Sequence, residues 1–285
     1  MESSKKLYKS GVAFHDCKWD VTGRTVENEI STFHMRLNRF LSECGITSRR
    51  KADNLIKVGR ITVNGKVVRT LGSVVDETAD MVALDGKPVR KERKRYVMLN
   101  KPPFYLTSLK SMEDGKKTIT SFLGGIEQRV YPVGRLDYDS EGLLILTNDG
   151  ELANRIHHPR YKVVKTYLAE VSGDVPDDLE AVLSGGVEIE KRFTKPDSVS
   201  VLQVSPGRAR ASISFHEGRK HLVKKYFEAF GLRVARLKRI SCGNVRLGGL
   251  GKGEWRDLNP GEIKNLRKMT GLLSRDQKKT PGGAV

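Results

Sequence analysis

The segment from residue 134 to residue 150 holds the side chains most suited to chemistry. It places a polar loop between two apolar runs, with Arg135 two residues before the carboxylate of Asp137. Reactive groups concentrate on loops that a rigid scaffold supports, and the flanking glycines permit the close approach of a ligand. Asp137 could therefore act as a nucleophile or as a general base. The alternative, on local chemistry alone, is an aspartate that stabilises its own turn.

Other segments carry further candidate side chains. Tyr167 lies in a β-rich run, where an aromatic ring more often packs in the core. Lys224 lies at the border of an apolar helical stripe within residues 222–230, a position that suits a lysine reaching toward a pocket. His157 and His158 have no carboxylate or cysteine at ligand spacing, so we expect them to be structural or to face RNA, and we expect no metal site.

The elements that must position these side chains are short. From residue 96 onward, hydrophobic periodicity predicts strands at 96–100, 130–134, 143–147, 166–172, 199–204 and 211–215. It predicts helices at 151–156, 177–183 and 220–230. Strands outnumber helices and do not alternate with them regularly. This favours an α+β domain built on a mixed, largely antiparallel β-sheet with flanking helices over a Rossmann or TIM-barrel architecture.

Residues 36–69 predict a smaller unit of two helices followed by a hairpin. Gly45 and Gly59 lie where the two helices should end, and Ser48 is suited to cap the start of the second helix. The dipeptide Asn64-Gly65 between two short β-rich runs predicts the hairpin turn.

Basic side chains are concentrated in this small unit, where nine of them stand against two acidic ones. Such density suits contacts with phosphate groups, and several of the cations fall in the first turn of the second helix, where the helix dipole already favours an anion. The alternative is an ordinary solvated helix face. The side chains that we expect to bind RNA are Arg36, Arg39, Arg49, Arg50, Lys51 and Arg60.

Composition points to a polyanionic partner. The chain has 285 residues and a formal net charge of +18, large enough to attract nucleic acid before any specific contact forms. No run of roughly 18 apolar residues is present, so we expect no membrane partner. Three widely spaced cysteines, Cys17, Cys44 and Cys242, indicate neither a disulfide framework nor a zinc ribbon, which fits a reducing cytoplasm.

The chain is expected to divide into five segments. Residues 1–34 are interpreted as a disordered extension, 35–88 as a small RNA-binding domain and 89–95 as a basic linker. The linker either guides RNA or is a plain solvated connector. Residues 96–273 are expected to form the catalytic domain, and 274–285 a disordered tail. A second basic cluster, between residues 208 and 239, is interpreted as an RNA-facing rim of the catalytic domain.

Two sets of motifs resemble known families. Residues 36–41, 45–53 and 63–65 look like an S4-type RNA-binding domain, which recognises structured RNA through its backbone and shape. The Gly-Arg-Leu-Asp of residues 134–137, followed by residues 142–150, resembles the signature of the pseudouridine synthases, specifically the ribosomal RNA branch with an amino-terminal S4 domain. Residues 99–103, 165–167 and 217–225 match the same family in order, so the resemblance covers about residues 36–270.

The pseudouridine synthase resemblance assigns roles to individual residues. It implies that Asp137 attacks the flipped uridine or its ribose, and that Tyr167 stacks on the base and helps to remove a sugar proton. It implies that Lys224 pairs with Asp137, because a nearby cation keeps a buried carboxylate ionised. Arg135 would fill the space that the base leaves. The remaining residues that we expect to bind substrate are Leu136, Lys101 and Arg219.

This sequence departs from the common family pattern at Leu222, where glutamine is frequent, and at Lys224 and Lys225, where arginines are frequent. Lysine lacks the two-pronged geometry of arginine, which leaves the contact with Asp137 open.

The sequence therefore favours an enzyme that isomerises a specific uridine in ribosomal RNA, with the large subunit preferred over small-subunit or transfer RNA. The alternative is a non-catalytic RNA-binding or ribosome-assembly factor on the same fold. We expect no cofactor, structured ribosomal RNA as the partner, a monomeric state and a cytoplasmic location.

Overall fold

The computed structural model describes residues 34–110 and 115–272, and the chain divides into two compact units. The first unit comprises the residues up to 40 together with 49–89, and the second comprises 41–48 and the residues from 90 onward. Apart from His34, the expected extension (1–34) and tail (274–285) lie outside the described residues. The five segment boundaries stay predictions.

The first unit contains the predicted helices and hairpin. The helices are α1 (Leu37–Glu43) and α2 (Arg49–Lys57), and the hairpin joins β2 (Ile61–Val63) to β3 (Lys66–Val67). Asn64 and Gly65 both have positive φ, at 50° and 78°, as the favoured two-residue hairpin turn requires. The remaining strands are β1 (His34–Arg36), β4 (Val74–Asp76), β5 (Val82–Leu84) and β6 (Lys87–Pro88). β1 pairs with β4, and the other four strands form a sheet in the order β3-β2-β5-β6.

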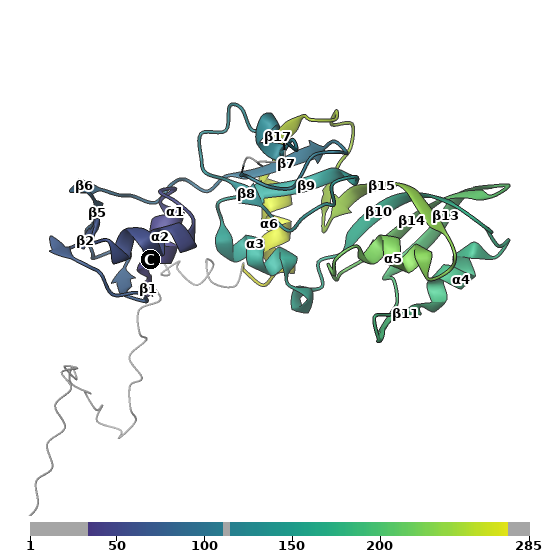
Figure 1. Cartoon of the computed structure of the whole chain (residues 1–285), viewed down its shortest axis with the longest axis horizontal. Coiled ribbons are helices and arrows are strands. Elements are labelled where there is room, and N and C mark those ends of the chain that lie inside the picture. The colour runs from purple at the N-terminus through teal and green to yellow at the C-terminus, as the bar shows by residue number, and fades with distance from the viewer. Residues whose placement is uncertain (1–33, 111–114, 273–285) are drawn as a thin grey trace, which may run out of the picture. The chain divides into compact units, whose positions relative to one another are not determined.

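The second unit is built on one sheet, which has nine strands within the described residues (Figure 1). The strands are β7 (Tyr96–Lys101), β8 (Tyr131–Pro132), β9 (Glu141–Thr147), β10 (Lys165–Ser172), β13 (Ser198–Ser205), β14 (Arg208–Phe215), β15 (Arg233–Cys242), β16 (Val245–Arg246) and β17 (Trp255–Asp257). Their order is β13-β14-β10-β15-β9-β7-β17, with β16 beside β15 and β8 beside β9. Among the described strands only β9 and β15 pair in parallel, which confirms the α+β class and the mixed, largely antiparallel sheet.

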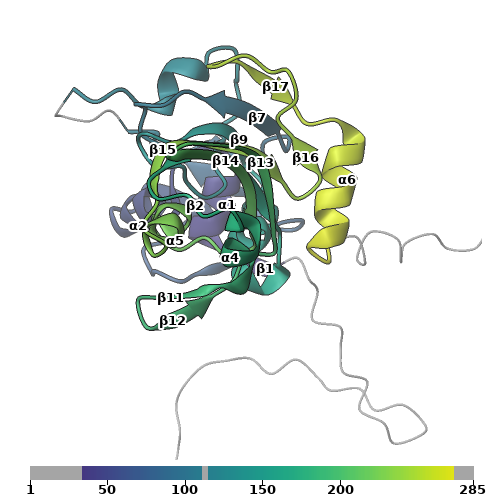
Figure 2. The same ribbon diagram turned by 90° about the vertical axis from the view of Figure 1, so that its right-hand side faces the viewer.

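Helices cover each half of this sheet. They are α3 (Gly150–His157), α4 (Leu179–Gly185), α5 (Leu222–Glu228) and α6 (Pro260–Met269), with a hairpin of β11 (Val187–Ile189) and β12 (Arg192–Thr194). In Figure 2, α4 and α5 lie on the concave side of the curved strands β13, β14 and β15. Their apolar residues share one core with β10, β14 and β15, and those of α3 and α6 share another with β7 and β9. No helix in the described part of the chain is both long and apolar enough to cross a membrane.

The two halves meet where β9 and β15 pair. Arg239 lies opposite Gly142 in that pairing. A Cβ at Gly142 would lie 2.3 Å from the carbonyl oxygen of Arg239, and its φ of +104° also disfavours a side chain. Only glycine therefore lets these strands approach. The loop before β9, which carries the predicted catalytic aspartate, consequently emerges at the junction between the two halves.

Several elements differ from the prediction. The strand expected at 130–134 is only Tyr131–Pro132, and the helix expected at 220–230 begins at Leu222. β15, β17 and α6 were not predicted. β15 was hidden because its four basic residues, buried and exposed alike, interrupt the alternation of apolar and polar positions. The start of α6 does have a sequence indicator, because Asn259 and Glu262 form a capping box there.

Candidate functional site

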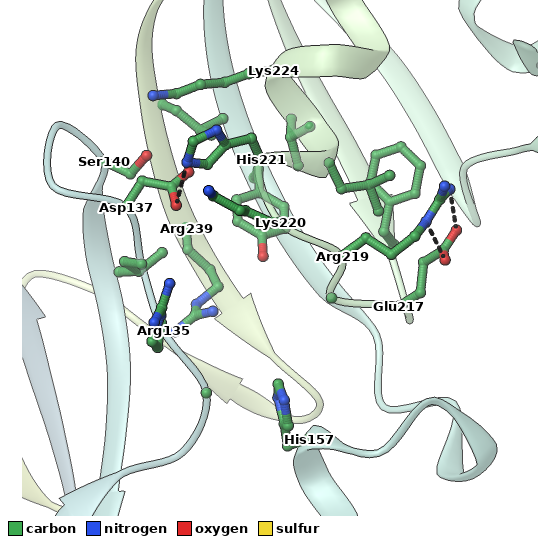
Figure 3. Close-up of a pocket in the computed structure, with 18 of the residues that line it drawn as sticks. Arg135, Asp137, Ser140, His157, Glu217, Arg219, Lys220, His221, Lys224 and Arg239 are labelled. Atoms are coloured by element: carbon green, nitrogen blue, oxygen red, sulfur yellow. Dashed lines mark hydrogen bonds and ion pairs between the residues drawn. The ribbon is translucent and has the colours of Figure 1, made fainter. Parts of the chain in front are cut away.

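A cavity of about 380 Å³ opens at the junction of β9 and β15. Its walls come from the loop before β9, from β10, from the connection between β14 and α5, and from β15 (Figure 3). Asp137, Tyr167 and Lys224 all line it. The structure therefore brings the three predicted catalytic residues, which lie far apart in the sequence, into one cavity.

The partner of Asp137 differs from the one expected. Lys224 does not pair with it: the Lys224 Nζ lies 2.5 and 2.6 Å from the two carboxylate oxygens of Asp139, on the same loop. His221 faces Asp137 instead, with its Nε2 3.5 Å from Oδ1. His221 directly precedes α5 with a φ of 56°, a left-handed conformation uncommon outside glycine, and this conformation directs its ring at the loop.

The pairing of Lys224 with Asp139 has an electrostatic consequence. Partial burial would raise the pKa of Asp139, but the hydrogen bonds and attraction of Lys224 outweigh it and lower that pKa. The ammonium charge of Lys224 is thus compensated within the loop.

Lys101 is not among the residues that line the cavity, and its role in substrate binding stays a prediction. Its side chain is fully buried, and its ammonium donates to backbone carbonyls of the loop that carries Asp137 and to the carbonyl of the next residue, Pro102. The acceptors are the oxygens of Ser140 at 2.7 Å, Pro102 at 3.0 Å, Asp137 at 3.2 Å and Tyr138 at 3.4 Å. Burial lowers its pKa to about 8, although the nearby carboxylates of Asp139 and Asp137 oppose the shift. Lys101 thus holds the loop in place.

The other predicted substrate-binding residues line the cavity. Leu136 is buried, and its backbone N–H and carbonyl both bond to the hydroxyl of Thr107, at 3.2 and 2.7 Å. Arg135 is exposed and has no ion-pair partner among the described residues. Arg219 is anchored instead, because its Nε and Nη2 donate to the carboxylate of Glu217 at 3.0 and 3.2 Å. Contact between these three side chains and a substrate stays a prediction.

Tyr167 both packs against the core and lines the cavity. It lies on β10 opposite Ile213 of β14 and Arg239 of β15. Its ring packs against two hydrophobic clusters, yet it also lines the cavity. Core packing therefore fixes the ring at the cavity wall.

Four residues at or beside the cavity were not among the predicted site residues. His221 lies within the segment 217–225, and Asp139 lies on the same loop as Asp137. Weighing every charged residue inside these two segments would have found both. Arg239 was expected on an RNA-facing rim, but it is only 5% exposed and lines the cavity. His157 lines the cavity as well, and burial, followed by repulsion from Lys165 and Arg239, lowers its pKa.

The predicted RNA-binding residues lie in the first unit. Five are exposed and Arg39 is half-buried. Arg60 pairs with the carboxylate of Asp85, which compensates part of its charge. No group of side chains that could hold a metal ion is found among the described residues.

Comparison with known proteins gives consistent matches to both units. Residues 95–229 match the family described as RNA pseudouridylate synthase, and residues 35–82 match the S4 domain. An uncharacterised RNA pseudouridine synthase of Aquifex aeolicus is 54% identical over 84% of this chain and 96% of its own length. The ribosomal large subunit pseudouridine synthase B of Bacillus subtilis is 41% identical over 82% of this chain and 96% of its own. A crystal structure of a pseudouridylate synthase superposes with a TM-score of 0.57 at 28% identity, covering 81% of this chain and 99% of that one.

Proposed function

Because this chain belongs to the RNA pseudouridylate synthase family, whose members isomerise uridine in RNA, we propose that it modifies a specific uridine of large-subunit ribosomal RNA. The choice of RNA rests on the relative from Bacillus subtilis, whose name states that substrate. The observation that carries the chemistry is the cavity shared by Asp137, Tyr167 and Lys224.

In the proposed reaction the target uridine leaves the RNA stack and enters this cavity, because a stacked base does not expose its glycosidic bond. Asp137 acts as the nucleophile, and Tyr167 stacks on the base and serves as a base toward the sugar. When Asp137 attacks C1′, an ester forms and the C1′–N1 bond breaks; the uracil rotates, its C5 attacks C1′ and displaces the Asp137 carboxylate, and C5 then loses its proton. If Tyr167 instead removes the C2′ proton as the C1′–N1 bond breaks, that proton returns to C2′ when the C1′–C5 bond forms. Arg135, exposed beside the cavity, occupies the space that the uridine vacates in the RNA.

Charges around the cavity support an anionic substrate. Arg219 and Lys224 have carboxylate partners, whereas Arg135 and Lys220 have none among the described residues. These two cations are exposed at the cavity, where they suit the phosphates on either side of a flipped nucleotide. The S4 domain adds affinity for structured RNA through its exposed basic side chains. A monomer that acts in the cytoplasm without a cofactor or metal stays a prediction.

The proposal is tested with unmodified transcripts of large-subunit, small-subunit and transfer RNA. We expect pseudouridine at one position of the large-subunit RNA with the wild-type protein and none with Asp137→Asn. Asp174→Asn, which removes an exposed carboxylate outside the cavity, serves as the matched control and should modify the same position.

Product on another RNA alone would correct the proposed substrate. Binding without any product would favour the non-catalytic RNA-binding alternative. An equal yield from Asp137→Asn would remove Asp137 as the nucleophile.

A further inference from the structure

Arg239 is a cavity residue to which the proposed mechanism gives no role. It lies on β15, with its Cα opposite Tyr167 on β10 and opposite Gly142 on β9. Directly opposed residues of antiparallel strands project to the same face, so Arg239 and Tyr167 share the cavity wall. Figure 3 shows the Arg239 side chain reaching into the pocket below Asp137. Because Arg239 is only 5% exposed, it lies deep in the cavity.

The hydrogen bonds of Arg239 are incomplete. Its Nε donates to the carbonyl oxygen of Leu143 at 2.7 Å, which fixes the plane of the guanidinium. Within the described part of the chain no acceptor is found for its two terminal nitrogens, which carry four further N–H donors. The terminal nitrogens are not among the fully buried atoms that lack a partner, so they face the open cavity, where a ligand can reach them. This arrangement is expected where a ligand supplies the acceptor.

The charges nearest to Arg239 make the need for an acceptor stronger. Repulsion from Arg239 contributes to the lowered pKa values of His157, Lys165 and Lys101, so other basic groups surround it. The two carboxylates of the cavity are held by other partners: Asp137 faces His221, and Glu217 holds Arg219. Arg239 is therefore a fixed cation whose terminal N–H groups can bind an electron-rich group of a ligand.

We infer that Arg239 donates hydrogen bonds from its terminal nitrogens to a carbonyl oxygen of the target uracil and stabilises the negative charge that this base acquires as it leaves the sugar. This inference rests on the proposed function. Buried apolar side chains, Leu136, Phe215 and Leu237 among them, also line the cavity, and they suit a flat base better than a hydrated phosphate.

The chemistry of the step accounts for this charge. When the C1′–N1 bond breaks, its electron pair stays on the uracil and spreads over N1 and the two carbonyl oxygens. The same pair departs whether Asp137 attacks C1′ or a base removes a proton from C2′. Arg239 keeps all its protons and only donates hydrogen bonds. A donor that is already oriented stabilises such charge at little reorganisation cost, because the Leu143 carbonyl holds the guanidinium before substrate binds.

The first test compares Arg239→Gln with Lys238→Gln on the RNA that the wild-type protein modifies. Lys238 lies on the same strand and does not line this cavity, so its substitution removes one positive charge without changing the site. We expect Arg239→Gln to lower the single-turnover rate by about 100- to 1,000-fold, as loss of one oriented donor does elsewhere, with little change in the Kd for RNA. Lys238→Gln should retain the wild-type rate. Equal rates for the two variants, or a loss confined to Kd, would overturn the inference.

The second test substitutes single atoms in the RNA. Fragments carrying 2-thiouridine or 4-thiouridine at the modified position replace one carbonyl oxygen with sulfur, a weaker acceptor. We expect one of them to slow the wild-type protein strongly. It should slow Arg239→Gln much less, because this variant already lacks the contact that the sulfur atom weakens. If neither thio substitution slows the wild-type protein, the inference is wrong, and this result needs no folded variant. Fragments with a methylphosphonate beside the modified position test a phosphate contact, and coupling of Arg239→Gln to these alone would also refute the uracil contact.

The outcomes separate this inference from the proposed function. If the wild-type protein makes no pseudouridine on any of the three RNA classes, the proposed function itself fails. If it makes pseudouridine and Arg239→Gln is equally fast, only the role of Arg239 fails.

Discussion

Replacing Lys101 with methionine tests whether a buried cation holds the catalytic loop. Methionine has a similar length and fills the fully buried space, but it removes the ammonium, whose three N–H groups lie within reach of four backbone carbonyl oxygens. Two of these contacts, to Ser140 and Pro102, are no longer than 3.0 Å. A hydrogen bond from a charged group contributes about 1.5–3 kcal/mol, so the two together contribute about 3–6 kcal/mol before the cost of burying the lysine is subtracted.

The burial cost is substantial, because burial alone is the largest cause that lowers the pKa of Lys101 to about 8. We therefore expect Lys101→Met to lower the free energy of unfolding by about 1–3 kcal/mol, because it leaves backbone carbonyls without a donor, equivalent to a fall in Tm of roughly 2–12 °C. The loop that carries Asp137 should also shift, and a displacement on the order of 1 Å costs about 100-fold in rate.

Urea and thermal denaturation would measure the stability of Lys101→Met, and pseudouridine formation at saturating RNA would measure its rate. Lys264→Met, an exposed substitution on α6, is the control and should match the wild-type protein in both assays. If Lys101→Met keeps wild-type stability and rate, the ammonium does not hold the loop and the reasoning is refuted.

Three further predictions follow from the same structure. The pKa of Lys101 is lowered from 10.5 to about 8, so the cost of burying its charge is present below pH 8 and is relieved between about pH 8 and 10.5. In that range the free energy of unfolding should rise with pH while the rate of pseudouridine formation falls. Denaturation and rate measured across this range would contradict the prediction if the rate did not fall. Gly142→Ala places a Cβ 2.3 Å from a carbonyl oxygen of β15 and should lower the free energy of unfolding, measured with urea, by about 3 kcal/mol or more. Gly249→Ala is the control, because nothing lies within 4 Å of its Cβ. Equal stabilities of the two variants would show that the strands can separate freely. Arg49→Ala combined with Arg50→Ala should weaken RNA binding and flatten its dependence on salt, because fewer phosphates are neutralised, and an unchanged slope of log Kd against log salt would argue against phosphate contacts by α2.

Local patterns in the sequence predicted much of the fold. β7, β9, β10, β13 and β14 were each located from hydrophobic periodicity, and the turn at Asn64-Gly65 from its residue types. β15 was not predicted, because its four basic residues, of which Arg239 is buried, mask its alternation. Its position beside β9 also required a long-range pairing that no local pattern encodes.

The candidate site shows the same division. The motif around Asp137 indicated the reactive loop, and Tyr167 and Lys224 were expected to join it. The structure places all three in one cavity, but the Lys224 ammonium donates to the carboxylate of Asp139, and His221 lies next to Asp137. Spacing along a chain does not say which of two carboxylates, two residues apart on one loop, lies within reach of a given cation.

By itself the sequence determined which residues are candidates for the chemistry, the basic character of the chain and the type of many of its regular elements, since each depends on residue chemistry and short-range periodicity. Tertiary structure alone decided how those groups are used: Lys101 became a buried support for a loop, and Arg239 a fixed cation deep in a cavity. The physical reason is that burial and hydrogen-bond partners, which set what a lysine or arginine can do, are properties of strands and loops brought together from distant parts of the chain.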